Sequence, residues 1–158
     1  MTLTNDGRYM IVGLADGFVK VFDFQTKQEI HTFNGGSLAL SNKIFSVNTW
    51  GNRFIMAGYE SGEILIFDLE KRELIHFQSA HGSAVTSIAA TSDGSYLVSC
   101  SRDKSVKIFN LQVVKQELGT FFHEGICRGI NFYKMIIRLC DGIGSNKRWT
   151  KYYLCRRR

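Results

Sequence analysis

The amino-acid sequence predicts an all-β chain built from one antiparallel unit that is repeated several times. Three stretches align without a gap: GRYMIVGLADGFVKVFD at 7–23, NRFIMAGYESGEILIFD at 52–68 and GSYLVSCSRDKSVKIFN at 94–110. A self-match with a period of about 40 to 45 residues indicates one supersecondary unit copied along the chain. The 158 residues also include no proline and 15 glycines, which is typical of short strands joined by many turns.

Each aligned stretch predicts a β-hairpin. In the third copy, an apolar run at 96–100 is followed by a turn at 102–104 and by a second run at 106–109, in which apolar residues alternate with a lysine. The corresponding turns contain Asp16-Gly17 and Ser61-Gly62, residue types that accept left-handed backbone or hydrogen-bond their own main chain. Two strands and a tight turn therefore occur once per copy.

A further strand is predicted on each side of the hairpin. The preceding strand is visible at 44–49 and 84–91, and the following strand at 27–33, 73–77 and 115–121. Four short antiparallel strands per period are typical of the blade of a β-propeller. The predicted blades span about 1–34, 43–78 and 81–122, with the start of a fourth at 123–133.

The repeat resembles that of the WD-repeat family. The segment SRDKSVKIFN at 101–110 resembles the end of the family's repeat, with Phe109 where Trp is usual, and Ala80-His81-Gly82 resembles its Gly-His start. The resemblance covers about residues 1–133. It implies a partial WD-repeat β-propeller, a fragment of a longer one, because the first blade lacks most of its first strand and the fourth stops after its opening.

The resemblance also implies a structural hydrogen-bond chain across the third blade. In this family a histidine, a serine or threonine, an aspartate and a tryptophan bond one another, and the first three carry over to His81, Ser99 and Asp103. Phe109 has no indole N–H, so at most three residues are expected in the chain. In the second copy Ser61 replaces the aspartate, and weaker serine bonds are expected to hold that turn. The other structural repeat positions are Asp16, Phe22, Asp23, Phe67, Asp68, Phe109 and Asn110.

No catalytic, cofactor or metal site is predicted. His81, Ser99 and Asp103 have the residue types of an acyl-transfer triad, but that reaction needs an exposed hydroxyl, an oxyanion hole and a cleft, whereas here the serine lies in a predicted strand. The nucleotide-binding, hydrolase and zinc-protease motifs are missing. The four cysteines show no metal-ligand spacing, so reduced thiols are expected.

The positive charge of the chain lies in its last 25 residues. Residues 1–133 hold 12 Lys or Arg and 13 Asp or Glu, whereas 134–158 hold eight Lys or Arg and a single Asp. This basic tail carries no repeat pattern. Three explanations stay open: an artefact of a mispredicted gene end, a solvated and disordered basic extension, and a basic-aromatic arm that binds phosphate backbones and stacks bases.

The predicted function is a non-catalytic platform for protein–protein interaction. Propeller rims present loops to partner proteins, and no apolar run is long enough to span a membrane. An intracellular, cytoplasmic location is expected, since the first residues do not resemble a signal peptide. The alternative function is binding of nucleic acid or another acidic surface through the tail 134–158.

An arc of about three blades is expected to self-associate, to pair with another propeller or to aggregate. Its uncovered faces and outermost strands are expected to expose apolar side chains and unpaired backbone groups. The residues expected on those faces include Val19, Val21, Ile64, Ile66, Val106 and Ile108.

Overall fold

The computed structural model describes residues 1–35, 43–91, 93–111 and 116–122, and every regular element within these ranges is a β-strand. The strands form three four-stranded sheets in which neighbours run antiparallel. The predicted all-β class, with four-stranded antiparallel blades, is confirmed. The predicted fourth-blade start at 123–133 and the tail 134–158 lie outside the described residues.

The first blade contains β1 (Thr2–Leu3), β2 (Tyr9–Gly13), β3 (Phe18–Asp23) and β4 (Glu29–Asn34), paired in chain order. Its first strand is only two residues long. In β3 the buried residues alternate with partly exposed ones, which is the period of two that side chains follow along a strand.

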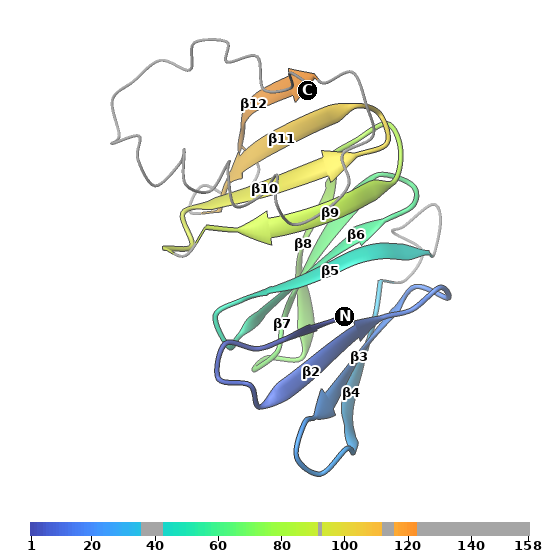
Figure 1. Cartoon of the computed structure of the whole chain (residues 1–158), viewed down its shortest axis with the longest axis vertical. Helices are drawn as coiled ribbons and strands as arrows, with labels where there is room; N and C mark the ends of the chain where they lie inside the picture. Colours follow the sequence, from blue (N-terminus) through green and yellow to red (C-terminus); the bar gives the residue numbers. More distant parts are fainter. Residues whose placement is uncertain (36–42, 92, 112–115, 123–158) are drawn as a thin grey trace, which may run out of the picture.

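The second blade contains β5 (Ile44–Trp50), β6 (Phe54–Tyr59), β7 (Glu63–Asp68) and β8 (Glu73–Ser79). Every residue of β7 is buried, since this strand lies in the central sheet and has a neighbouring blade on each face (Figure 1). The third blade contains β9 (Val85–Ala90), β10 (Tyr96–Ser101), β11 (Ser105–Asn110) and β12 (Gln116–Phe122).

All three blades share one irregularity that the sequence did not indicate. The pairing between the third and fourth strands shifts register directly before the aligned phenylalanine. A bulge of this kind bends the strand and increases its twist. The shifts lie between Val21 and Phe22, between Ile66 and Phe67, and between Ile108 and Phe109.

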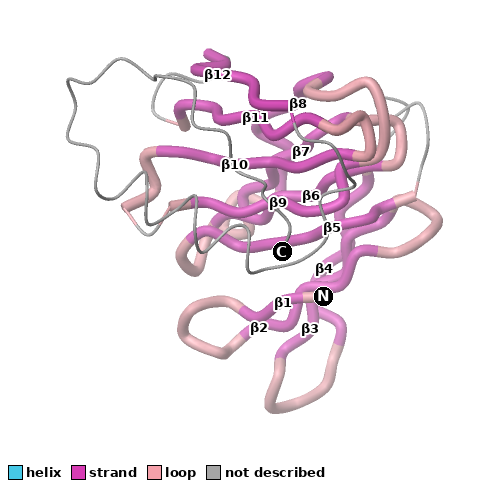
Figure 2. Tube along the Cα trace, turned by 45° about the horizontal axis from the view of Figure 1, so that its top comes forward, coloured by secondary structure: helices cyan, strands magenta, loops and turns pink. Residues whose placement is uncertain are grey.

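The blades are stacked face to face along the long axis of the molecule, as Figures 1 and 2 show. Side-chain hydrogen bonds join their first strands. The Thr49 hydroxyl donates to the Leu3 carbonyl at 3.0 Å, which links β5 to β1. The Ser46 hydroxyl donates to the Val85 carbonyl, at 3.1 Å, and thus links β5 to β9.

Two hydrophobic cores lie between the blades. Alternate residues of β7 contribute to different cores, because Leu65 belongs to the core shared with the first blade and Ile64 to the core shared with the third. The first core consists of Ile11, Val19, Val21, Phe33, Ile55, Ala57, Tyr59, Leu65 and Phe67. The second consists of Met56, Ile64, Ile66, Ala80, Val85, Ile88, Leu97 and Phe109.

The apolar residues expected to be exposed at the faces of the arc are buried, so this part of the expectation is wrong. Neighbouring blades cover the ones in the first two blades, because each lies in one of the two cores. Exposed large hydrophobic residues among those described are Met1, Leu3, Phe24 and Ile75. The buried residues are Val19, Val21, Ile64, Ile66, Val106 and Ile108.

Candidate functional site

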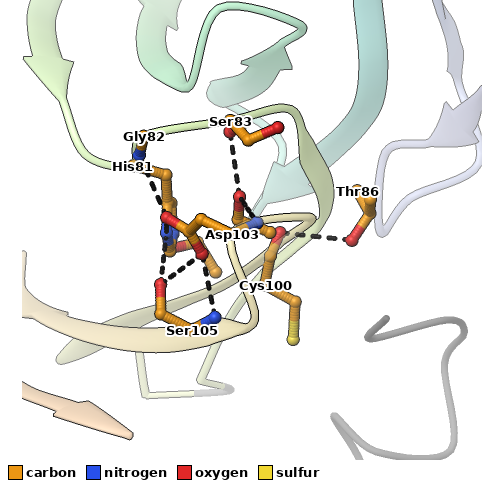
Figure 3. Close-up of polar contacts among 9 residues, drawn as sticks. His81, Gly82, Ser83, Thr86, Cys100, Asp103 and Ser105 are labelled. Atoms are coloured by element: carbon orange, nitrogen blue, oxygen red, sulfur yellow. Dashed lines mark hydrogen bonds and ion pairs between the residues drawn. The ribbon is translucent and has the colours of Figure 1, made fainter. Parts of the chain in front are cut away.

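His81 lies at the centre of a buried polar cluster in the third blade (Figure 3). It follows β8, and its backbone amide donates to the Gly62 carbonyl at 3.0 Å, which fixes the loop before β9. Its side chain is completely buried. The imidazole Nε2 lies 2.7 Å from the Ser99 hydroxyl oxygen. On the other side of the ring, Nδ1 lies 2.8 Å from the Ser105 hydroxyl oxygen and 3.1 Å from Oδ2 of Asp103.

The partners of His81 determine the direction of these hydrogen bonds. The Ser105 hydroxyl donates to Oδ1 of Asp103 at 2.6 Å, so it acts as an acceptor toward the ring. Nδ1 therefore carries a proton and donates to Ser105 and Asp103. In the neutral imidazole Nε2 is then an acceptor, and the Ser99 hydroxyl donates to it.

The Asp103 carboxylate is held in its charged form. Burial acts to raise its pKa, but hydrogen bonds from the Ser105 hydroxyl, the Ser105 amide and the Gly82 amide, together with nearby His81, outweigh that effect and lower the pKa to about 2. The two amides lie 2.8 and 3.0 Å from the carboxylate oxygens. The aspartate thus ties the turn before β11 to the loop before β9.

The structure brings together the three residues assigned by resemblance and adds a fourth. The expectation of at most three members is wrong, because Ser105 bonds both His81 and Asp103. A signal was present in the sequence: an aspartate two residues before a serine is typical of a turn in which the carboxylate accepts from the residues that follow.

This cluster presents no nucleophile to solvent. The Ser99 side chain lies within β10 and has no exposed surface, and its hydroxyl is already hydrogen-bonded to the imidazole. The residue types of a hydrolytic triad are therefore arranged as an internal connection between a strand, a turn and a loop.

In the second blade, the residues aligned with Asp103 and Ser105 are also polar, but each has a buried side-chain oxygen without a hydrogen-bond partner. Ser61 occupies the Asp103 column and Glu63 the Ser105 column, so the order of carboxylate and hydroxyl is reversed. The Ser61 hydroxyl and Oε2 of Glu63 are buried without a hydrogen-bond partner. The expectation that serine bonds hold this turn is wrong, because the hydroxyl bonds nothing.

The acids that end the third strands of the first two blades have identical roles. Oδ1 of Asp23 accepts from the amides of residues 25 and 26, both at 2.9 Å. Oδ1 of Asp68 accepts from residues 70 and 71 at 3.0 and 3.1 Å, and Arg53 also binds its Oδ2 at 2.7 Å. Asn110 ends β11 at the same position of the repeat. The other turn acid, Asp16, is exposed and accepts from the Phe18 amide at 3.3 Å.

The aligned phenylalanines differ in burial. Phe67 is completely buried and lies 5.0 Å from Phe33 between their ring centres. Phe109 is 6% exposed and belongs to the second core. Phe22 is only half-buried, because no sheet among the described residues packs on its face of the first blade.

A largely apolar cavity of about 360 Å³ lies between the second and third blades. Trp50 stacks on Phe54 on one side, with 4.8 Å between the ring centres. The cavity is lined by Ile66 of the second blade, Leu97 and Phe109 of the third, and Ile75, which is 43% exposed on β8. This groove was not predicted, since it depends on how the side chains of two neighbouring blades meet.

The described part of the chain shows no site for a metal ion. It contains no group of three or more His, Cys, Asp or Glu side chains placed to hold one. It also has no helix long and apolar enough to cross a membrane.

Consecutive four-stranded antiparallel meanders, stacked face to face, are the arrangement of β-propeller repeat proteins. The family model "WD domain, G-beta repeat" matches residues 72–110, which run from β8 to the end of β11. The chain is a WD-repeat protein, and the resemblance inferred from its sequence is confirmed.

Several proteins match about two thirds of this chain. Striatin from Rattus norvegicus is 32% identical over 116 residues, which cover 70% of this chain and 15% of striatin. U3 small nucleolar RNA-associated protein 12 from Saccharomyces cerevisiae is 32% identical over 110 residues, 69% of this chain and 11% of that protein. The guanine nucleotide-binding protein subunit beta from Zea mays is 27% identical over 112 residues. The match spans 30% of that subunit and 66% of this chain.

A solved structure has the same fold. A chain in the crystal structure of the mitotic checkpoint complex superimposes with a TM-score of 0.72 at 24% identity. The match covers 79% of this chain and 37% of that one. It therefore shows that the three blades have the arrangement found in a larger protein.

Proposed function

We propose that this chain is a non-catalytic platform that binds partner proteins. The observation that carries the proposal is the groove between the second and third blades. It is apolar, it is large enough to receive one or two side chains of a partner segment, and Ile75 stands half-exposed at its border. A buried anchor in such a pocket is the usual centre of a protein interface.

Polar groups beside the groove favour a peptide as the occupant. His76 and Gln78 of β8 border the cavity, and their side chains lie 3.4 Å apart. β8 is the outermost strand of its sheet, so its outer backbone groups are available to an extended partner segment. The cytoplasmic location expected from the sequence is part of this proposal.

The test compares two matched substitutions in the full chain. Ile75→Glu places a charge at the groove, and Phe24→Glu places one at an equally exposed residue in the turn after β3. Proteins captured from cell extract by the wild type and by Phe24→Glu, but lost with Ile75→Glu, would support the proposal once their binding is reproduced with purified components. A set of bound proteins that is identical for all three chains would overturn it.

The alternative of nucleic-acid binding depends on residues 134–158. These lie outside the described residues, and no structural observation favours that function. Catalysis is not part of the proposal, since the serine of the triad-like cluster, Ser99, has no exposed surface.

A further inference from the structure

The fourth strands of the blades differ at one aligned position that faces the next blade. Val19 of β3 pairs with Phe33 of β4, and Ile64 of β7 pairs with Gln78 of β8. Because Val19 and Ile64 are aligned in the repeat, Phe33 and Gln78 occupy the same position. By register, the third blade has Phe121 there. Of the three described blades, the second therefore has glutamine where the other two have phenylalanine.

Phe33 fills the space between the first and second blades. Its side chain is 3% exposed and belongs to the first core. Its ring lies 5.0 Å from the Phe67 ring, measured between centres, with 38° between the ring planes. This distance is within the range that aromatic pairs prefer. Phe33 thus anchors the first blade on an aromatic residue of the second.

The groove occupies the corresponding space between the second and third blades. Phe109, which is aligned with Phe67, lines the groove. Gln78 lines it too but is only partly buried, and its amide oxygen lies 3.4 Å from Nε2 of His76. The groove of about 360 Å³ therefore corresponds in the repeat to the space that Phe33 fills at the first junction.

A bulge in β8 places two consecutive side chains at the border of the groove. Ile66 pairs with His76 and Phe67 with Leu74, so Ile75 is the extra residue of the bulge. Consecutive residues of a regular strand point to opposite faces, yet Ile75 and His76 both line the groove. Ile75 is 43% exposed, and β8 is the outermost strand of its sheet. The groove is therefore accessible from the outer edge of the second blade.

We propose that the groove binds the phenyl ring of an aromatic side chain in an extended partner segment. The ring takes the position relative to Phe109 that Phe33 has relative to Phe67. This inference deepens the proposed function and rests on it, because it names the side chain that the groove receives.

The size and the chemistry of the groove agree with this occupant. An apolar cavity of about 150 Å³ is enough to bind benzene, so about 360 Å³ admits a phenyl ring together with its attachment to a backbone. The groove is continuous with the second core through Ile64, Ile66 and Leu97. The side-chain amide of Gln78 offers both a donor and an acceptor, which suits a peptide group beside the ring.

Two small probes test the groove in the full chain. N-acetylphenylalanine amide is titrated and followed by NMR, with N-acetylleucine amide as its aliphatic counterpart. We expect a dissociation constant of about 1 mM for the phenylalanine probe. It should bind roughly three- to tenfold more tightly than the leucine probe, which is what an aromatic pair adds to apolar burial. Equal affinities, or no saturation up to about 10 mM of the phenylalanine probe, would overturn the proposal.

Gln78→Phe supplies the ring from the chain itself, as Phe33 does at the first junction. This variant should bind the phenylalanine probe at least about tenfold more weakly than the wild type. It should also unfold at a higher urea concentration, because the new ring fills an apolar cavity. Gln25→Phe adds the same residue at an exposed turn after β3 and should bind the probe like the wild type. Unchanged binding by Gln78→Phe would place the probe elsewhere and overturn the proposal.

Phe109→Leu gives an independent test that does not depend on filling the groove. It keeps an apolar wall but removes the aromatic ring on which the probe is expected to pack. The preference for the phenylalanine probe over the leucine probe should fall below about twofold. A preference that stays as large as in the wild type would contradict the assigned position of the ring.

Capture of partner proteins separates this inference from the proposed function. Partners lost with both Ile75→Glu and Gln78→Phe would support both conclusions. Partners lost with Ile75→Glu but retained by Gln78→Phe would leave the proposed function in place and overturn the aromatic anchor. Partners retained by both variants would overturn both conclusions.

Discussion

The imidazole Nε2 of His81 lies 2.7 Å from the hydroxyl oxygen of Ser99, although the two residues are 18 positions apart. Through its other nitrogen the same ring contacts Asp103 and Ser105. A single buried side chain thus connects the loop before β9, the strand β10 and the turn before β11. Removal of any member leaves polar groups of the others without partners.

Asp103→Ala is expected to destabilise the chain by about 1 to 3 kcal/mol, which is the usual penalty for leaving buried donors unsatisfied. The carboxylate accepts from the Ser105 hydroxyl, the Ser105 amide and the Gly82 amide. Equilibrium urea unfolding followed by circular dichroism measures the difference.

Ser61→Ala is the matched control in the same column of the second blade. The Ser61 hydroxyl is buried and bonds nothing, so its removal should change the free energy of unfolding by less than about 0.5 kcal/mol or increase it slightly. Equal losses for Asp103→Ala and Ser61→Ala would show that the polar cluster does not stabilise the third blade.

Acid should weaken the contribution of Asp103. Its pKa is lowered from the ordinary 3.8 to about 2 in the folded chain, so the folded state binds a proton less readily than the unfolded state. The stabilisation is complete above about pH 4 and is lost as the pH falls toward 2. Relative to that of Asp103→Asn, the free energy of unfolding of the wild type should fall by about 1 kcal/mol over this interval. The expected loss is small because the carboxyl is partly exposed and solvent screens its interactions.

Other acids titrate in the same interval, and the comparison with Asp103→Asn removes their effect. Asp93 is an example, because hydrogen bonds from the Ser95 and Thr91 hydroxyls lower its pKa to about 2 as well. A pH-independent difference for Asp103→Asn would contradict the prediction.

Much of the fold could be predicted because the same local sequence pattern occurs three times along the chain. The alternation in 106–109 and the turn residues at 16–17 identify hairpins without any tertiary information. The bulge before each aligned phenylalanine could not be predicted in this way. The bulge depends on how the fourth strand pairs with the third. The fourth strands of the three blades have few aligned residues in common, so the sequence pattern does not indicate this pairing.

The site was only partly predictable for a similar reason. The places of His81, Ser99 and Asp103 in the repeat indicate their roles, whereas the role of Ser105 follows from a local turn motif, an aspartate two residues before a serine. The groove beside Trp50 depends on contacts between blades. The match between Phe33 and Gln78 depends on the register of β4 and β8, which the sequence does not fix.

Gly94→Ala should be among the more destabilising single-methyl changes in the chain, by about 2 to 4 kcal/mol, since it combines backbone strain with overpacking. Gly94 has φ of +70°, and a Cβ added there would overlap the Trp50 indole of the neighbouring blade. Thermal and urea unfolding measure the loss.

Gly7→Ala separates the two contributions. Gly7 occupies the corresponding turn of the first blade with the same φ of +70°, but a Cβ there would have no neighbour within 4 Å. The Gly7→Ala substitution should therefore lower the free energy of unfolding only through backbone strain, by about 1 to 2 kcal/mol. If the two substitutions were equally destabilising, Trp50 would not pack on Gly94 as the structure shows.

Phe109→Trp should be tolerated and should stabilise the third blade by about 0.5 to 1.5 kcal/mol, the net value of one added hydrogen bond. Phe109 pairs with Leu97, so Ser99 is its diagonal neighbour on the same face and within reach of a long aromatic side chain. The Ser99 hydroxyl donates to His81, and its oxygen can still accept from an indole N–H. The adjoining cavity of about 360 Å³ gives the larger ring space.

Urea unfolding measures the effect of Phe109→Trp. Phe67→Trp is the control, because Phe67 occupies the same column in the second blade and is completely buried. A loss of stability at Phe109 as large as that at Phe67 would mean that the indole cannot reach Ser99 and that the cavity does not admit it.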